Sequence, residues 1–219
     1  FIPSPAAPSP RFSVDVAGVY TFFLRVTDAA GESCGPEASV SVLVVPDDAL
    51  HIELLWSTPS RIGAGSPYEG VGTDLDLHLV HPFAQGVDVN GDGLRDGYFD
   101  MPFDCFWSNT NPLWSSGQDA QSNPRLDRDD TDGEGPENMN IDTPQSGLTY
   151  TVGVHYWDDH GFGEAKATLR VFVYGNLVYE EGGVGMVEGD LWDALTIAWP
   201  SAEVSVKRGS SGERQIYPM

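Results

Sequence analysis

The sequence predicts an all-β fold, a β-sandwich of jelly-roll type. Short segments rich in β-branched and aromatic residues alternate between apolar and polar positions, as in 51–56 and 74–80. Turn-forming residues separate these segments, and the chain holds 25 glycines and 16 prolines. No window keeps a helical period over several turns. Because so many antiparallel strands must bury their apolar faces, two packed sheets are the expected arrangement.

Composition divides the chain into four parts. Residues 1–10 form a linker rich in proline, alanine and serine, which we expect to be extended. Residues 11–47 predict two strands joined by a turn, and residues 48–207 predict the sandwich, with a long loop-rich region at 82–147. Residues 208–219 are polar and predict a flexible tail. The strands expected in the sandwich are 51–56, 74–80, 148–156, 165–174, 177–181, 191–199 and 203–207.

The charge of the chain argues against several classes of partner. The formal net charge is −22, whereas a nucleic-acid backbone or an anionic membrane surface attracts lysine and arginine. No apolar run approaches the ~18–20 residues that span a bilayer, so we expect no membrane insertion. The chain begins with neither Met nor a signal-like apolar segment. We therefore expect it to be part of a longer polypeptide whose targeting information lies upstream.

The segment from Asp88 to Asp96 has the spacing of a calcium loop. Oxygen-bearing side chains stand at every second position, and Gly93 allows the sharp turn that wraps a chain around an ion. Calcium takes roughly six to eight oxygen ligands. The predicted ligands are Asp88, Asn90, Asp92, the Leu94 carbonyl, Asp96 and, one residue late, Asp100. The alternative is a solvated Asp/Gly turn that binds no ion.

A second acidic constellation lies at 127–137. Alternation along 74–80 places Asp74, Asp76 and His78 on one face of a strand, toward solvent or this acidic segment, with leucines on the other. Dense like charges cost stability unless they are solvated, hydrogen-bonded or metal-bound. A second candidate calcium site therefore consists of Asp74, Asp76, Asp129, Asp130, Asp132 and Glu137. A solvated acidic surface is the alternative.

Aromatic side chains crowd the loop-rich region beside asparagines. Trp107, Asn109 and Trp114 are candidate ligand-binding residues, since tryptophan faces and amide groups hold sugars in many β-sandwich modules. The alternative is a satellite core that pins the loop to the sandwich. Trp157 alternates with apolar strand residues, which predicts a core position.

The sequence favours a non-catalytic protein. It contains neither GxSxG nor HExxH. Asp158 and His160 suggest a hydrolase as the alternative, but histidines in turns beside aspartates more often form local hydrogen bonds. Cys34 and Cys105 predict a disulfide, which would close a loop worth about 4 kcal/mol. Two unrelated buried thiols are the alternative to that bond.

Three parts of the chain resemble known families. VAGVYTFFLRVTDAAGE and ASVSVLVV, within 16–45, resemble the last strands of a PKD domain, an immunoglobulin-like module of bacterial surface proteins. DVNGDGLRD, at 88–96, is similar to the thrombospondin type 3 calcium loop. GTDLDLHLVHP, LDRDDTDGEGPENM and LTYTVGVHYWDDHG, within 50–200, resemble the YfaP-like β-sandwich domain of exported bacterial proteins, surface lipoproteins among them. The resemblances imply a partial immunoglobulin-like element before an exported sandwich with no established catalytic residues.

These observations predict a non-catalytic, calcium-stabilised adhesion or scaffold module at the cell surface. Calcium would order the long loop, which would then face a glycan or another surface protein. The alternative is a carbohydrate-binding module of a secreted hydrolase. In both hypotheses the protein is extracellular and Ca²⁺ is its cofactor.

Overall fold

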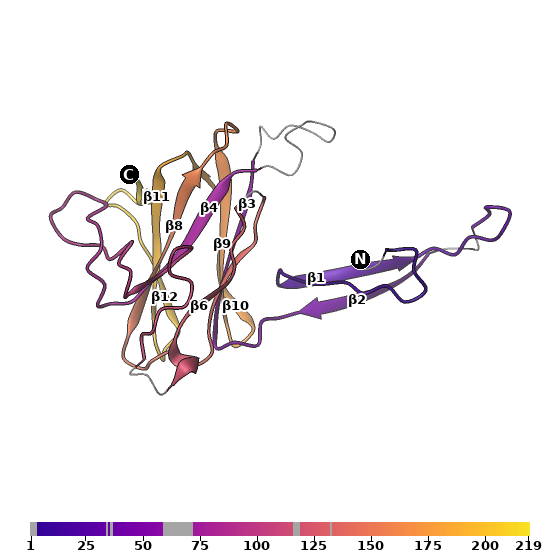
Figure 1. Cartoon of the computed structure of the whole chain (residues 1–219), viewed down its shortest axis with the longest axis horizontal. Helices are drawn as coiled ribbons and strands as arrows, with labels where there is room; N and C mark the ends of the chain where they lie inside the picture. The colour runs from indigo at the N-terminus through magenta and orange to yellow at the C-terminus, as the bar shows by residue number, and fades with distance from the viewer. Residues whose placement is uncertain (1–3, 34, 36, 59–71, 116–118, 132) are drawn as a thin grey trace. The chain divides into compact units, whose positions relative to one another are not determined.

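The computed structural model describes residues 4–33, 35, 37–58, 72–115, 119–131 and 133–219. The chain forms two compact units, residues 1–46 and 47–219, which are described separately. The division lies one residue from the predicted boundary. Within the described residues the regular structure is antiparallel strands and a single short 3₁₀ turn (Figure 1). The prediction of an all-β fold is confirmed.

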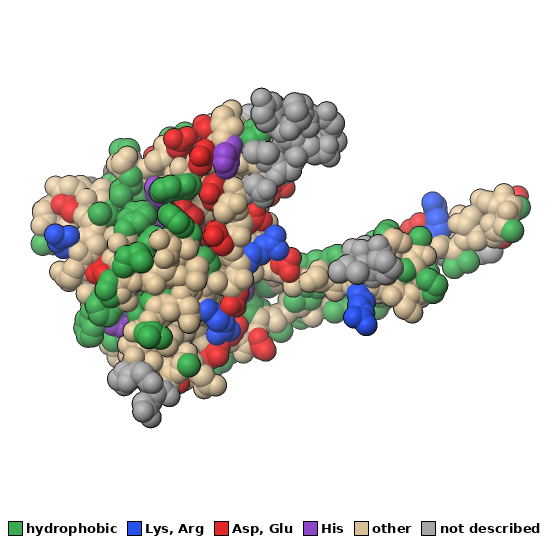
Figure 2. Space-filling view, viewed as in Figure 1, with side chains coloured by type: hydrophobic (Ala, Val, Ile, Leu, Met, Phe, Trp, Pro, Cys, Tyr) green, Lys and Arg blue, Asp and Glu red, His purple; other side chains and the backbone are tan. Residues whose placement is uncertain are grey.

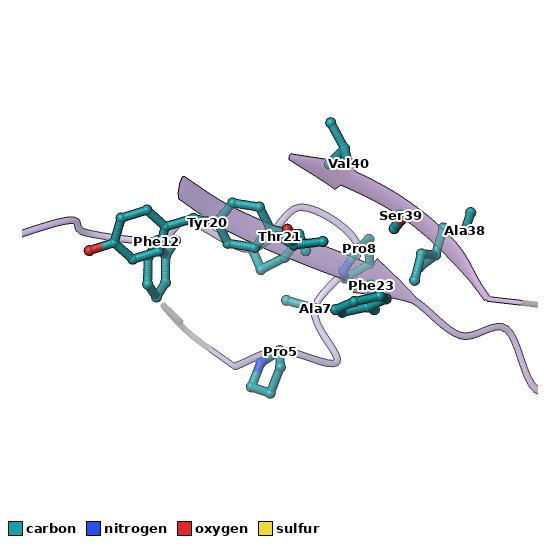
Figure 3. A pocket seen from close by; sticks show the side chains of 13 residues that line it. Pro5, Ala7, Pro8, Phe12, Tyr20, Thr21, Phe23, Ala38, Ser39 and Val40 are labelled. Atoms are coloured by element: carbon teal, nitrogen blue, oxygen red, sulfur yellow. The ribbon is translucent and has the colours of Figure 1, made fainter. Parts of the chain in front are cut away.

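The first unit is a two-stranded hairpin. Strand β1 (Gly18–Leu24) pairs antiparallel with β2 (Ala38–Val44). The ring of Phe12 packs against Tyr20 and Phe22, with ring centroids 5.6 Å and 5.3 Å away. These rings and the proline-rich segment before them line a cavity of about 880 Å³ (Figure 3). Two strands offer only one shallow apolar surface, and the partial PKD element stays a prediction.

The second unit contains two sheets. The five-stranded sheet has the order β10-β9-β3-β7-β6, and the six-stranded sheet has the order β12-β11-β8-β4-β5, with β13 paired to β11. The strands of the first are β3 (Leu50–Ser57), β6 (Arg125–Arg128), β7 (Glu137–Ile141), β9 (Ala165–Val173) and β10 (Asn176–Met186). Those of the second are β4 (Asp74–Val80), β5 (Asp104–Cys105), β8 (Thr149–Asp158), β11 (Asp190–Ala198), β12 (Glu203–Val206) and β13 (Ile216–Pro218).

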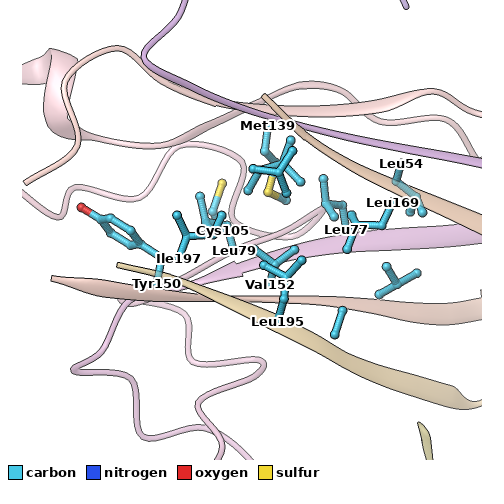
Figure 4. Close-up of a cluster of buried hydrophobic side chains, with 14 of the residues drawn as sticks. Leu54, Leu77, Leu79, Cys105, Met139, Tyr150, Val152, Leu169, Leu195 and Ile197 are labelled. Carbon is cyan, nitrogen blue, oxygen red and sulfur yellow. The ribbon is translucent and has the colours of Figure 1, made fainter. Parts of the chain in front are cut away.

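The core lies between these two sheets. Leu75, Leu77 and Leu79 of β4 are fully buried and belong to the same hydrophobic cluster as Leu54 of β3 and Met139 of β7. Figure 4 shows such side chains lying between the ribbons of the two sheets. The alternation along 74–80 therefore predicted the core face of this strand correctly. A β-sandwich is the arrangement that results, while its jelly-roll topology stays a prediction.

The opposite face of β4 is also buried. Tyr98 and Phe106, from the long connection after β4, pack against His78, with ring centroids 5.6 Å and 5.1 Å away. Tyr98 belongs to a second hydrophobic cluster with Val80 and Leu191. Part of the region predicted as loop-rich, 82–147, thus covers the outer face of β4. It also contains β5, β6, β7 and a 3₁₀ turn at Ala120–Ser122.

The predictions for the C-terminal tail and for Cys105 differ from the structure. Residues 208–219, predicted to be a flexible tail, include β13, whose backbone pairs with Asp190–Trp192 of β11. Cys105 is a free, buried thiol rather than half of a disulfide, and its Sγ lies 3.6 Å from the Thr110 carbonyl oxygen. Its burial raises the pKa of the thiol. Cys34 lies outside the described residues.

Candidate functional site

Three carboxylates converge where the two sheets meet at the edge of the sandwich. Asp76 lies on β4, Glu137 begins β7, and Asp129 follows β6 in the connection between β6 and β7. Each offers an oxygen within 4.8 Å of the other two. We call these three residues the acidic cluster. Its members come from both sheets, so it exists only in the assembled sandwich.

The backbone edge of β4 fixes the position of Glu137. Within the described part of the chain, β5 pairs with β4 only at Leu79 and Val80. The amide of Leu77 donates instead to Glu137 Oε2, at 2.6 Å. Register on the other side of β4 places Asp76 opposite His155 of β8. Neighbouring strands therefore hold both buried carboxylates in place.

Several buried oxygens at this place accept no hydrogen bond from the described part of the chain. Asp76 is 2 % exposed and Glu137 is 0 % exposed. Among the described residues no donor reaches Asp76 Oδ2, Glu137 Oε1 or the neighbouring Asp74 Oδ1. His155 Nδ1 approaches Asp76 Oδ2 to 3.7 Å, which is beyond hydrogen-bond distance. Buried carboxylate oxygens are costly unless they are paired or coordinate a metal.

The electrostatics of the cluster follow from this crowding. Burial raises the pKa of Glu137 well above its ordinary value, and the charges of Asp76 and Asp129 add to the effect. The pKa of Asp74 rises to about 7 for the same reasons: burial first, then Asp76 and Asp129. Three or four anions at this distance repel one another unless a cation or protons neutralise them.

Two tryptophans border the same place. Asp74, Asp76, Asp129, Thr131, Trp107 and Trp157 line a cavity of about 190 Å³. We call it the acidic cavity. Trp107 is 40 % exposed and Trp157 is 50 % exposed, and their ring centroids lie 5.4 Å apart with the planes inclined by 54°. Figure 2 shows acidic and hydrophobic side chains side by side on the sandwich surface.

The structure brings together most of the residues of the second predicted metal site. Asp76, Asp129 and Glu137 form the cluster, and Asp74 lines the adjoining cavity. Asp130 is outside the cluster, and its Oδ2 forms an ion pair with Arg128 at 3.2 Å. Asp132 lies outside the described residues. An all-oxygen set of this kind suits a hard cation such as Ca²⁺ rather than zinc or copper.

The first predicted metal site, at 88–96, has a different arrangement. Asp88 accepts hydrogen bonds from the amides of Gly91 and Gly93, each at 2.8 Å. Asp96 Oδ2 accepts one from Val89 at 2.8 Å. Asx-type hydrogen bonds therefore close the loop. They are the bonds expected of a solvated Asp/Gly turn, which is the alternative to a calcium site. Further bonds of this loop join Asn90 to the Asp92 amide and Asp92 to the Leu94 amide, while Asp100 accepts from Gln85.

Another carboxylate group lies at the end of β8. Asp158, Asp159 and Glu188 have oxygens within 4.8 Å of one another. They accept local hydrogen bonds; Asp159, for example, accepts from the amides of Gly161 and Gly163. His160 Nδ1 lies 2.7 Å from the Gly72 carbonyl oxygen. The His160 amide donates locally to Asp158, as expected of a turn, but the His160 ring contacts a segment 88 residues away.

The residues predicted to bind a ligand in the loop-rich region lie in different environments. Trp114 is buried and stacks on Tyr150, with ring centroids 5.8 Å apart, so it belongs to the core. Asn109 donates its side-chain amide to the Asp104 carbonyl at 2.7 Å and holds the chain locally. Trp107 is the candidate that stays accessible. The prediction of a core position for Trp157 is wrong: it is 50 % exposed and follows the fully buried Tyr156, so it lies on the outer face of β8.

A comparison of the chain with family models, with curated proteins and with solved structures finds no match. Within the described ranges, no helix has the length and apolar character needed to cross a membrane.

Proposed function

We propose that this chain is a non-catalytic adhesion or scaffold module of a larger exported protein, stabilised by Ca²⁺ at the acidic cluster. The observation that carries the proposal is the convergence of Asp76 and Glu137 on Asp129. Both are buried, and each has an oxygen that accepts no hydrogen bond from the residues that the structure describes. Asp74 adds a further carboxylate beside them.

The chemistry of these ligands favours calcium. The groups are carboxylates, and calcium accepts carboxylates in mono- or bidentate form with flexible geometry. Water completes the shell where protein oxygens are too few. A doubly charged ion also neutralises the repulsion between the buried carboxylates of the cluster. The ion would bind to Asp76 Oδ2 and Glu137 Oε1, the oxygens that accept no hydrogen bond within the described residues.

The ion would stabilise the fold by joining its two sheets. Asp76 belongs to the six-stranded sheet, while Glu137 belongs to the five-stranded sheet. A ligand that binds only the folded chain stabilises it by mass action, by about 2.7 kcal/mol when its concentration is 100 times its Kd. Extracellular modules bind calcium with a Kd of about 10⁻⁴–10⁻³ M. The full effect therefore needs roughly 10–100 mM calcium, and millimolar calcium gives a smaller stabilisation.

The test is thermal unfolding in excess calcium and in chelator. We expect calcium to raise the Tm of the wild-type chain by roughly 5–10 °C, the shift that about 2.7 kcal/mol produces in a chain of this size. In Glu137→Gln the shift should disappear, because glutamine keeps an acceptor for the Leu77 amide but removes the charge. Metal counting by native mass spectrometry should give one fewer ion in this variant.

Two further variants make the test specific. Glu203→Gln removes an exposed charge on β12, outside the cluster, and should keep the full calcium shift. Asp88→Asn alters the loop at 88–96 and should also keep it. If Asp88→Asn abolishes the shift and Glu137→Gln does not, calcium acts at the loop and the cluster is not its site. Equal Tm values in calcium and chelator for the wild type would refute a calcium role at either place.

A further inference from the structure

The exposure of Trp107 and Trp157 needs an explanation beyond cation binding. A calcium ion is held by oxygens, and neither indole ring contributes a ligand to it. Both rings nevertheless line the acidic cavity with half or nearly half of their surface open to solvent. Indole is the largest side chain, so leaving two of them adjacent and exposed forgoes considerable apolar burial. Adjacent exposed aromatic rings of this kind mark binding surfaces.

Buried aromatic side chains hold the two indole rings in place. Trp107 contacts the edge of Phe106, with centroids 6.1 Å apart, and Phe106 in turn stacks on the fully buried His78. Trp157 packs against His155, with centroids 5.9 Å apart, and His155 is itself buried. Rings supported by buried side chains lose little freedom when a ligand binds. The surface is therefore organised before any ligand arrives.

The walls of the cavity restrict the chemistry of that ligand. One wall is apolar and aromatic, and the other consists of Asp74, Asp76 and Asp129. A free anion is repelled by the carboxylates. A ligand that fits both walls has a C–H face for the rings and oxygen groups for a cation bound by the carboxylates. The volume of about 190 Å³ lies below the ~300–1,000 Å³ of pockets for drug-sized ligands, so one small ring fits.

We propose that Trp107, Trp157 and the cation at the acidic cluster form a binding site for one unit of a neutral sugar. The sugar places a ring face on the indoles and directs neighbouring hydroxyls at the cation, where they replace water in its shell. Affinity for one unit is weak, and a surface protein gains strength by presenting several copies. This inference rests on the proposed function, because the hydroxyls need the bound ion.

The experiment is binding of the whole chain to a panel of immobilised neutral oligosaccharides, in excess calcium and in chelator. We expect binding to at least one neutral glycan in calcium and its loss in chelator. Trp107→Ala and Trp157→Ala should each weaken it at least roughly tenfold. Trp157→Phe, which keeps a ring, should retain more affinity than Trp157→Ala. Tyr174→Ala, which removes an exposed ring elsewhere, should bind like the wild type.

The outcomes separate this inference from the proposed function. The calcium shift in Tm should survive in both tryptophan variants, since the rings are not ligands. A full calcium shift with no glycan bound, or with binding unaffected by either tryptophan change, overturns the sugar site but leaves the calcium site. Absence of the calcium shift overturns both. Binding of choline in competition with calcium would also overturn the sugar site, since it would identify a pocket for organic cations.

Discussion

Glu181, on β10, accepts hydrogen bonds from three side chains at once. Tyr179 donates to it at 2.6 Å, and Arg208 and Arg214 each donate at 2.7 Å. The two arginines lie in the segment between β12 and β13, so one carboxylate joins that segment to the five-stranded sheet. Burial alone would raise the pKa of Glu181, but these hydrogen bonds outweigh burial and lower it to about 2.

The Glu181 contacts predict a loss of stability in acid. Because the pKa in the folded chain lies below its ordinary value of 4.5, the stabilisation is present above pH 4.5 and is lost as the pH falls from 4.5 to about 2. Glu181→Gln should lower the free energy of unfolding at pH 7 by about 1.5–3 kcal/mol, the range for hydrogen bonds to a charged group. The difference from the wild type should shrink below pH 4.5.

Urea unfolding at pH 7 and at pH 3 measures this difference. Glu203→Gln, whose residue is exposed on β12, serves as the control and should track the wild type at both values. A gap between Glu181→Gln and the wild type that is equally large at both pH values would mean that packing, and not charge, causes it.

At the scale of elements, one close contact fixes the long connection between β4 and β8. Tyr98 lies over Gly153 of β8, where a Cβ would come within 2.5 Å of the tyrosine ring. The Tyr98 hydroxyl donates to Asp193 Oδ1 at 2.6 Å, and Lys207 donates to both oxygens of that carboxylate at 2.8 Å. The absence of a side chain at Gly153 therefore lets the connection reach the sheet.

This contact predicts the effect of a single methyl group. Gly153→Ala should destabilise the chain by about 1–3 kcal/mol, because the rigid, fully buried Tyr98 cannot move aside without losing its bond to Asp193. The free energy of unfolding in urea measures this cost. Gly153→Ala should cost less in a Tyr98→Leu background than in the wild type, whereas an equal cost in both backgrounds would assign the effect to the strand itself.

The elements differ in how far the sequence predicts them. β4 has strict alternation, and its leucine face was predicted correctly. β7, which lies next to β3 within the five-stranded sheet, was missed because its sequence ENMNI shows only two apolar residues. Its polar residues are buried rather than solvated; Asn140 Oδ1, for example, lies 2.5 Å from His51 Nδ1. Such partners come from distant segments, which a local pattern does not reveal.

At the scale of the whole molecule, charge is the dominant feature. A formal charge of −22 repels itself in the compact state, and salt screens this repulsion. The Tm of the chelated chain should therefore rise when NaCl increases from about 0.01 M to about 0.5 M, as the Debye length falls from roughly 30 Å to under 10 Å. Differential scanning calorimetry measures the shift.

Calcium should act differently from this general screening. At equal ionic strength it should raise the Tm further than NaCl does, because it binds a specific set of oxygens. Magnesium chloride serves as the matched control, since Mg²⁺ requires a smaller octahedral site. If the calcium and sodium salts have the same effect at equal ionic strength, the carboxylates respond only to screening.

The sequence predicted the residue types of the candidate site and their grouping, but not the strand that brings them together. Asp74, Asp76, Asp129 and Glu137 stood out as carboxylates near one another in two acidic segments. Their convergence depends on β7 lying beside the free edge of β4, which only the packed sheets create. The role of the loop at 88–96 was predicted from spacing that calcium loops and Asx turns share, so spacing alone did not separate the two.

The hydrogen bond from the Leu77 amide to Glu137 has a consequence for solubility. An uncovered strand edge is a template on which a strand of another molecule can add, and such growth leads to aggregates. Glu137, itself fully buried, occupies an amide at this edge, so that this amide is not available to a foreign backbone. One side chain thereby helps to keep neighbouring copies of the chain from joining edge to edge.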